Sequence, residues 1–367
     1  MVSRPTVENA GPLEAIEAYF ANGWTDGLPI VPPTEAAVRE FVQRAGRDAQ
    51  EVLLTVSETN RQCTVEAAAI NAVMAGCRPE YFPVVVAALE GWADKRWGLG
   101  DRNYFYISIA STGGSGQLLI VNGPIRNEIS MNYGVNVFGA GNRANATIGR
   151  TMRLILLNVL GMTPGVFDMS VQGHPGKYSY CIAENEEESP WEPLHVEKGF
   201  APDESTVTVV GARGPVPVGG SGNLPVGGAE STRPEGVLEL FARVAKTARS
   251  HAGTMVVAMC PQHAEAIAKH GWTKRQVKEY LFEHTKERLT DEEWERVAQM
   301  GQRRGSSLGA DKLVQTVDGV HYRLTFRAPE DVLLVVAGGN NGFFSSVISN
   351  WSYWIPEGDY IIKPIKT

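Results

Sequence analysis

Two short apolar runs decide the fold class of this sequence, Met255 to Cys260 (MVVAMC) and Val332 to Ala337 (VLLVVA). Each has the length of a strand and lacks an alternating polar face, which is typical of a strand buried on both sides. Helical patterns lie between them, at Pro261 to His270 and Thr273 to His284, and this favours parallel pairing. The sequence therefore predicts an α/β or α+β fold with partly parallel, mixed sheets and flanking helices.

The residues before these runs add further helices and strands. Amphipathic or alanine-rich periodicity with suitable caps predicts helices, and short apolar runs beside glycine turns predict strands. The expected helices are Pro12 to Asn22, Glu35 to Arg44, Thr64 to Ala75, Pro79 to about Ala93 and Asn142 to Val159. The expected strands are Tyr104 to Ala110, Leu118 to Asn122, Tyr178 to Ala183 and Ser205 to Val210.

A glycine- and proline-rich stretch predicts the domain boundary. Gly211 to Gly228 has no apolar period, which is typical of a linker or loop. We therefore expect two α/β lobes, residues 1–210 and 232–367, joined by residues 211–231. The sequence shows no tandem repeat.

Composition narrows the class of partner. The chain has 367 residues and a net charge of −7, with no basic stripe, which argues against nucleic acid. No apolar run is long enough to span a membrane, and Met1 to Phe20 lacks the apolar core of a signal peptide. The four cysteines are widely spaced, which favours free thiols in a reducing, cytoplasmic setting. A small-molecule substrate is the expected partner, and a homo-oligomer or hetero-complex stays open.

One candidate nucleophile lies between two expected helices. Cys77 precedes the helix that begins at Pro79, and Arg78 is beside it. The positive end of a helix dipole and a neighbouring cation both favour the thiolate. The alternative is an inert buried thiol that packs in a helix–helix turn.

A glycine loop opens directly onto the helix that begins near Asn142. Backbone N–H groups at such a position, together with Arg143 and Asn145, suit a carboxylate or phosphate. The loop is neither a GxGxxG fingerprint nor a P-loop. A capped helix with surface arginines is the equally simple alternative.

The densest set of reactive side chains lies within residues 174–195. It contains His174, Lys177, Cys181, Glu187 and His195. Such residues can supply general acid/base groups or metal ligands, and His174, Glu187 and His195 are the candidate ligands for a divalent or transition metal. Glu184 and Glu186 are further carboxylates in the same run. No known zinc spacing occurs here, and an acidic run is often a solvated turn.

Two more motifs follow the expected parallel strands, where open α/β sheets bind ligands. Cys260 and His263 have the spacing of a nucleophile and its base, although buried core residues are the commoner explanation. Gly338, Gly339 and Asn340 follow the second strand, and their backbone amides suit a substrate. The alternative is a tight turn that needs glycine for its geometry.

Four strings resemble the UGSC-like family of bacterial proteins, some of whose members carry selenocysteine. They are WTDGLPIVPPT (24–34), AINAVMAGCRPEYFPVV (69–85), GAGNRANATIGR (139–150) and GHPGKYSYCIAENEEESPWEPLH (173–195). The resemblance implies thiol or selenol chemistry. The string that names the family, UGSC or CGSC, does not occur in this chain. Cys77 and Cys181 are the thiols that lie within matching strings.

Three functions are compatible with these features. The first is a thiol-dependent enzyme that acts on a small, anionic organic molecule, with Cys77 as nucleophile and His174, His195 or Cys181 assisting. Arg78, Asn142, Arg143, Asn145 and Lys177 would hold the substrate in this function. The second is a metal-dependent lyase or hydrolase. The third is a non-catalytic subunit or binding protein.

Overall fold

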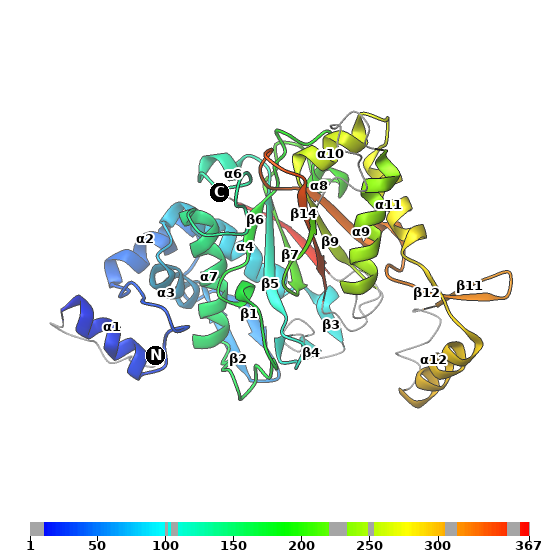
Figure 1. Cartoon of the computed structure of the whole chain (residues 1–367). Helices are drawn as coiled ribbons and strands as arrows, with labels where there is room; N and C mark the ends of the chain where they lie inside the picture. The colour runs from blue at the N-terminus through cyan, green and yellow to red at the C-terminus, as the bar shows by residue number, and fades with distance from the viewer. Residues whose placement is uncertain are drawn as a thin grey trace.

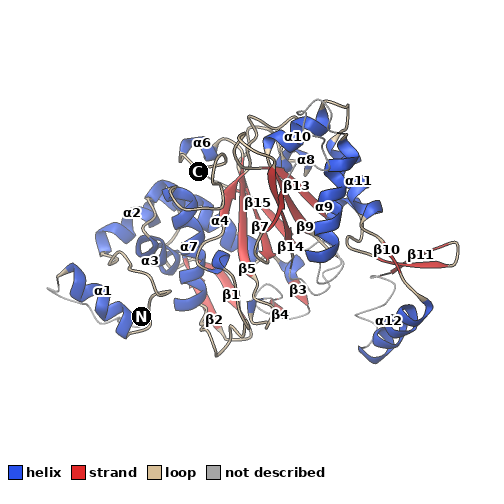
Figure 2. Ribbon diagram, viewed as in Figure 1, coloured by secondary structure: helices blue, strands red, loops and turns tan. Residues whose placement is uncertain are grey.

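Two four-stranded sheets lie face to face between two layers of helices in the computed structural model of the chain (Figure 1). The structure describes residues 11–99, 102–103, 109–219, 233–248, 253–304, 314–350 and 360–366. The expected α/β or α+β class with mixed sheets is confirmed. Figure 2 shows the strands between the helical layers.

The first sheet has the order β15-β7-β5-β6 and the second has the order β13-β9-β14-β8. β5 and β6 are parallel, as are β9 and β13, and the remaining pairs within both sheets are antiparallel. The strands are β5 (Gly116–Asn122), β6 (Cys181–Ala183), β7 (Thr206–Ala212), β8 (Val216–Gly219), β9 (Met255–Met259), β13 (Val332–Val336), β14 (Phe344–Ser349) and β15 (Tyr360–Pro364).

The expected parallel pair is confirmed as β9 and β13, with Val332 opposite Met255 and Val336 opposite Met259. Alternate side chains of both strands face opposite layers. Leu333 and Val335 pack between the two sheets, whereas Leu334 packs against the second helical layer. Burial on both faces is the reason for the unbroken apolar run.

Helices cover the outer face of each sheet (Figure 1). The first layer and its edge contain α1 (Pro12–Ala21), α2 (Glu35–Ala45), α3 (Val65–Ala75), α4 (Phe82–Trp92), α6 (Ile125–Glu128) and α7 (Arg143–Asn158). The second layer contains α9 (Pro234–Ala248), α10 (Pro261–Ala268) and α11 (Lys274–His284). The short helix α8 (Leu194–Glu197) contacts β13. Thr64, Asn142 and Thr273 cap their helices through side-chain oxygens.

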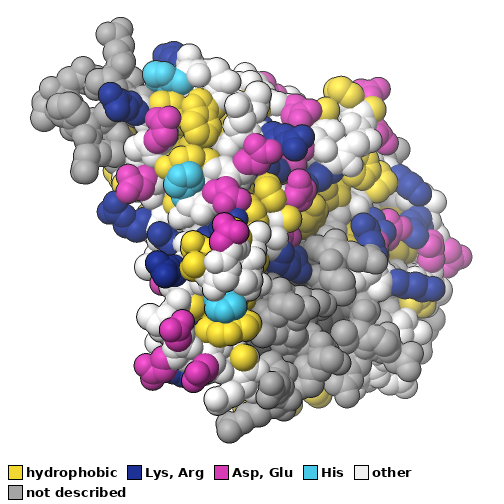
Figure 3. Space-filling view, turned by 90° about the vertical axis from the view of Figure 1, so that its right-hand side faces the viewer, with side chains coloured by type: hydrophobic (Ala, Val, Ile, Leu, Met, Phe, Trp, Pro, Cys, Tyr) yellow, Lys and Arg dark blue, Asp and Glu magenta, His cyan; other side chains and the backbone are white. Residues whose placement is uncertain are grey.

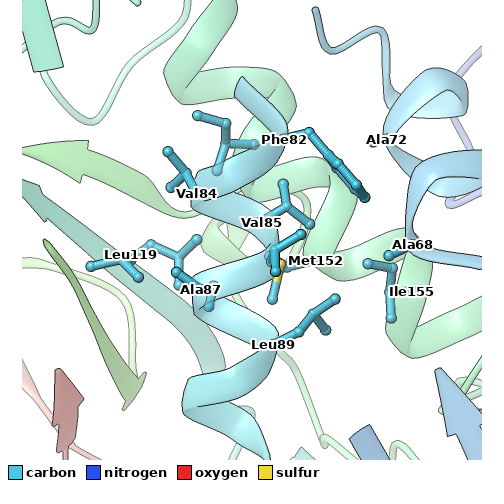
Figure 4. Close-up of a cluster of buried hydrophobic side chains, with 14 of the residues drawn as sticks. Ala68, Ala72, Phe82, Val84, Val85, Ala87, Leu89, Leu119, Met152 and Ile155 are labelled. Atoms are coloured by element: carbon cyan, nitrogen blue, oxygen red, sulfur yellow. The ribbon is translucent and has the colours of Figure 1, made fainter. Parts of the chain in front are cut away.

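The larger core lies between the first helices and the first sheet (Figure 4). Val85 of α4 lies beside Met152 of α7, Leu89 lies toward Ile155, and Phe82 lies toward Ala72 of α3. On the other side of α4, Ala87 lies toward Leu119 of β5. The small side chains of α3 let these helices approach closely. This packing fixes α7, and the loop that precedes it, against the sheet.

The two halves repeat one arrangement and exchange a strand. In each half a helix precedes the first parallel strand (α4 before β5, α9 before β9), further helices lead to its parallel neighbour, and an antiparallel strand follows. The next strand then joins the sheet of the other half: β8 pairs with β14, and β15 pairs with β7. The sequence shows no tandem repeat, so this repetition is a finding of the structure.

The exchange also revises the expected linker. Residues 216–219 form β8 and so belong to the second sheet, while residues 220–232 lie outside the described part of the chain. The expected strand at Tyr104 to Ala110 also falls largely outside it.

A small projecting unit completes the fold, with β10 (Glu287–Arg288), α12 (Asp291–Arg304), β11 (Val314–Val317) and β12 (Val320–Arg323). Two hairpins lie below the first layer, β1 (Val52–Val56) with β2 (Arg61–Thr64) and β3 (Gly98–Leu99) with β4 (Arg102–Asn103).

Helix α7 packs so closely on β6 that one of its glycines is required. A Cβ at Gly149 would lie 2.4 Å from Ser179 Oγ and 2.6 Å from the backbone nitrogen of Tyr180. Alanine within a helix normally stabilises by about 0.5–1 kcal/mol relative to glycine. We expect Gly149→Ala to destabilise instead, by about 1–3 kcal/mol, because the backbone must move.

Urea unfolding followed by circular dichroism measures this change. Gly236→Ala in α9 is the matched control, because a Cβ there meets nothing within 4 Å and should raise stability slightly. A stabilising effect of Gly149→Ala would contradict the close contact of α7 with β6.

Candidate functional site

The carboxyl ends of the two parallel strand pairs meet at one edge of the molecule. The N–H of Asn185, just after β6, donates to the carbonyl of Val336 at the end of β13 over 2.8 Å. The edge beyond the carboxyl ends of parallel strands is where α/β proteins usually bind ligands. Two loops from different halves of the chain therefore converge there.

These loops enclose a pocket of about 340 Å³. Residues 136–139, which precede α7, line one side, and residues 337–346, which join β13 to β14, line the other. Two glycine motifs of the sequence thus share one pocket. Gly338 and Gly339 line it as predicted, whereas Asn341 rather than Asn340 is the lining asparagine. None of the described residues that line the pocket has a charged side chain.

The glycine loop is held by residues of the other half. The N–H of Gly338 donates to the carbonyl of Tyr133 over 2.9 Å, and Asn185 Nδ2 lies 3.5 Å from the carbonyl oxygen of Gly338. The N–H of Ala337 donates to the carbonyl of Met259. The position of the pocket wall therefore depends on both sheets.

A serine of the pocket wall contacts a buried cysteine and a buried histidine, neither of which lines the pocket itself. Cys260 is the N-cap residue of α10, and His263 lies one turn into that helix. Ser345 begins the neighbouring strand and lines the pocket. Its Oγ lies 2.8 Å from Nδ1 of His263 and accepts the N–H of Cys260 over 2.9 Å. The rings of Phe241 and Phe343 contact the imidazole.

The four thiols differ in acidity. Burial raises the pKa of Cys63 to about 12, and it also raises the pKa of Cys77 and of Cys181. Burial acts in the same direction on Cys260. At Cys260, however, His263 opposes this effect through hydrogen bonding and its charge, and Ser345 opposes it through a hydrogen bond. Together they outweigh burial and lower the pKa of Cys260. Cys260 is thus the thiol whose surroundings favour the thiolate.

Cys77 does not have the surroundings that its sequence position predicts. Its thiol lies 3.2 Å from Thr151 Oγ1 and is buried under α7, while Arg78 is exposed. The burial that raises its pKa exceeds the influence of Arg143 and of two threonine hydroxyls. The inert-thiol alternative describes this site better than the nucleophile does.

The residues expected to hold an anion instead fix the loop before α7. Asn142 caps the helix and donates to the carbonyl of Ser130. Arg143 Nε donates to the carbonyl of Gly76 over 3.0 Å, and Asn145 bonds to both backbone groups of Asn132. Asn142, Asn145 and Nε of Arg143 thus hydrogen-bond within the protein.

A buried polar network lies behind the pocket, at the ends of β5 and β6. Asn122 Nδ2 donates to Glu184 and to Glu186, and the N–H of Gly123 donates to Glu186 over 2.8 Å. Arg126, 3% exposed, pairs with Glu186 and with Glu187. The sequence analysis did not single out Asn122 or Arg126. The sequence marks their position only through Gly123-Pro124, which follows a parallel strand and precedes a helix. Cys260-Pro261 has the equivalent position in the second sheet.

Glu184 and His195 are also deeply buried members of this network. Burial raises the pKa of Glu184, which exceeds the opposing influence of Lys274, the Leu194 N–H and Asn122. His195 is 1% exposed, and its Nδ1 lies 3.8 Å from Glu186 Oε1. Neither ring nitrogen has a hydrogen-bond partner among the described residues.

His174 and Lys177 lie at the opposite end of the first sheet. His174 Nδ1 accepts the N–H of Gly176, so Nε2 carries the proton and donates to the carbonyl of Ala212 over 3.2 Å. Burial lowers its pKa, which favours the neutral ring. Lys177 donates to Asp168 and Ser170 over 2.7 and 2.6 Å. These two residues are therefore separated from His195, although all three lie within one short stretch of sequence.

The expected metal ligands do not converge. His174, Glu187 and His195 each have different neighbours, and the described residues contain no group of three or more His, Cys, Asp or Glu side chains placed to hold a metal ion. Among the described helices, none is long and apolar enough to cross a membrane. On the face shown in Figure 3, acidic and basic side chains are mixed outside the grey region.

Comparison of the chain with protein-family models, with curated proteins and with solved structures finds no match. The resemblance to UGSC-like proteins therefore stays an expectation from the four strings.

Proposed function

We propose that the chain is a cysteine-dependent enzyme that acts on a small organic molecule, with Cys260 rather than Cys77 as the nucleophile. The cluster of Cys260, His263 and Ser345 supports this most strongly, because Ser345 Oγ lies 2.8 Å from His263 Nδ1 and accepts the N–H of Cys260. Within this cluster His263 lowers the pKa of the Cys260 thiol despite burial. A thiol beside an imidazole that is itself held by a third group is the arrangement that activates cysteine nucleophiles.

Each residue has a distinct role in this proposal. His263 takes the thiol proton and later returns it to the leaving group. Ser345 holds the imidazole through Nδ1 and is itself fixed by the N–H of Cys260. Cys260 is also the N-cap residue of α10, where the positive end of the helix dipole favours a thiolate. The thiolate bonds to an electrophilic carbon of the substrate while the bond from that carbon to the leaving group breaks, and the leaving group takes the proton from His263. Water then replaces the sulfur on that carbon and returns a proton to the thiolate.

The pocket favours an uncharged substrate, which revises the anionic one expected from sequence. Amide and hydroxyl groups of Asn136, Asn341 and Ser346 line it, together with Phe138 and Phe344. A carboxylate would lose water there without meeting a cationic side chain, and that is unfavourable. Cys260 is only 2% exposed, so the reacting group must enter past Ser345.

Alkylation of the native protein tests the nucleophile directly. Limiting iodoacetamide at pH 7, followed by peptide mass spectrometry, is expected to label Cys260 before the other thiols. Preferential labelling of Cys77 would overturn the assignment.

Charge selectivity tests the substrate class. We expect Cys260 to react with iodoacetamide roughly tenfold or more faster than with the anionic iodoacetate, relative to the same ratio for free cysteine, because the pocket offers the carboxylate no cation. Competition with both reagents and quantitative peptide mass spectrometry gives the ratio. The unfolded protein is the matched control and should show the ratio of free cysteine. Equal selectivity in the folded protein would contradict an uncharged substrate without affecting the role of Cys260.

A further inference from the structure

A small cavity lies between β5 and α7, away from the cysteine pocket. Its volume is about 20 Å³, and Gln117, Arg153 and Lys177 are among its lining residues. A cavity holds one water-sized group when this volume exceeds roughly 10–15 Å³. The cavity therefore has room for one small occupant, and its polar lining sets it apart from an apolar packing defect.

The buried amide of Gln117 lines this cavity and favours a bound species there. The residue is 7% exposed, and neither Oε1 nor Nε2 has a hydrogen-bond partner among the described residues. Gln117 belongs to β5, and its side chain shares the α7-facing side of the strand with Leu119. A buried amide without partners is unfavourable, and such groups normally bond to protein or to a bound species.

The charges around the cavity select the kind of occupant. Arg153 and Lys177 both pair with one carboxylate, that of Asp168, over 3.3 and 2.7 Å. The three side chains are only 12%, 14% and 3% exposed. Burial raises the pKa of Asp168, but Lys177, Ser170 and Arg153 outweigh it and lower that pKa, so the carboxyl is ionised at neutral pH. Among the described residues that form these pairs, two cations face one anion, which leaves one positive charge beside the cavity.

We propose that this cavity binds a single monatomic anion, chloride under ordinary conditions. Gln117 Nε2, Arg153 and Lys177 supply the donors, and the ion balances the excess positive charge. The volume suits one atom and disfavours a larger oxyanion such as sulfate. Bound there, the ion would connect β5, α7 and the loop that carries Lys177, and so stabilise the first half of the fold.

Halide dependence of thermal unfolding tests the site in the intact protein. We expect the Tm to rise by about 2 °C when sodium chloride or bromide replaces sodium gluconate at equal ionic strength and pH, at a halide concentration about tenfold above Kd. Gln117→Leu should abolish this halide-specific difference. Arg275→Gln, which removes an exposed pair in α11, is the matched control and should keep it.

Bromide in crystals of the unaltered chain gives an answer that does not depend on a variant. An anomalous peak in the cavity beside Gln117 is the expected result. Density without anomalous signal, together with equal Tm in halide and gluconate, would identify the occupant as water and overturn the proposal. Neither result bears on the reactivity of Cys260.

Discussion

Cys260→Ala is expected to abolish the fast reaction of the native protein with iodoacetamide at neutral pH. The reaction requires a thiolate, and burial raises the pKa of the other three thiols. Cys63→Ala, Cys77→Ala and Cys181→Ala are therefore expected to leave the rate unchanged. Stopped-time alkylation read by whole-protein mass spectrometry measures all four variants. A fast reaction that survives in Cys260→Ala would eliminate this residue as the nucleophile.

The pH dependence of the same reaction separates the effect of His263 on the pKa of Cys260 from the effect of burial. In the native protein the rate is expected to reach its half-maximum below pH 8.5, the ordinary midpoint of a free thiol, because His263 lowers the pKa of Cys260. In His263→Gln the midpoint should move upward, and the rate at pH 7 should fall at least tenfold, since each unit of pKa changes the thiolate fraction by about tenfold. His270→Gln, an exposed histidine beyond the end of α10, is the control.

The secondary structure could be predicted where one residue pattern decides it. The runs at Met255 and Val332 have apolar residues on both faces, and they form adjacent parallel strands as predicted. Asn142, Thr64 and Thr273 are caps whose function depends on residues only three positions away. The exchange of β8 and β15 was not predictable in this way. It depends on pairing between segments that are far apart in sequence, and β8 lies within a stretch whose glycines and prolines are typical of a linker.

The candidate site was predicted less well, for a physical reason. Cys77 and Cys260 both precede helices, so the dipole argument applies equally to both. The difference between them comes from neighbours outside each motif: Ser345 beside His263 for one, and burial under α7 for the other. His174 and His195 are close in sequence, but His174 precedes β6 and His195 follows it. A strand extends the chain by about 3.3 Å per residue, so the two histidines lie near opposite ends of the sheet. Reactive residues that cluster in the sequence therefore do not cluster in one site.

Arg126→Met is expected to destabilise the protein by about 2–4 kcal/mol, because it leaves two buried carbonyl oxygens without their donor and removes the cation from two carboxylates. The Arg126 guanidinium donates to the carbonyl oxygens of Gly123 and Glu184 and pairs with Glu186 and Glu187. Met fills a similar volume but satisfies none of these acceptors. The measurement is urea unfolding at pH 7. Arg275→Met is the control, since its pair lies in solvent, and no measurable change is expected there.

The effect of Arg126→Met should depend on pH in one direction. Burial raises the pKa of Glu187, but Arg126 and Asn127 outweigh it and lower that pKa. A carboxyl whose pKa is lower in the folded state stabilises the fold above its unfolded pKa, about 4.3, and that contribution is lost as pH falls through the folded value. The difference between the native protein and Arg126→Met should therefore be largest between pH 6 and 8 and should shrink below about pH 4. A difference that stays constant down to pH 3 would mean that lost packing, rather than the unpaired carboxylates, accounts for the destabilisation. In that case the network behind the pocket would hold its loops by shape alone, and Arg126→Lys, which keeps the charge but not the planar fork, would be as unstable as Arg126→Met.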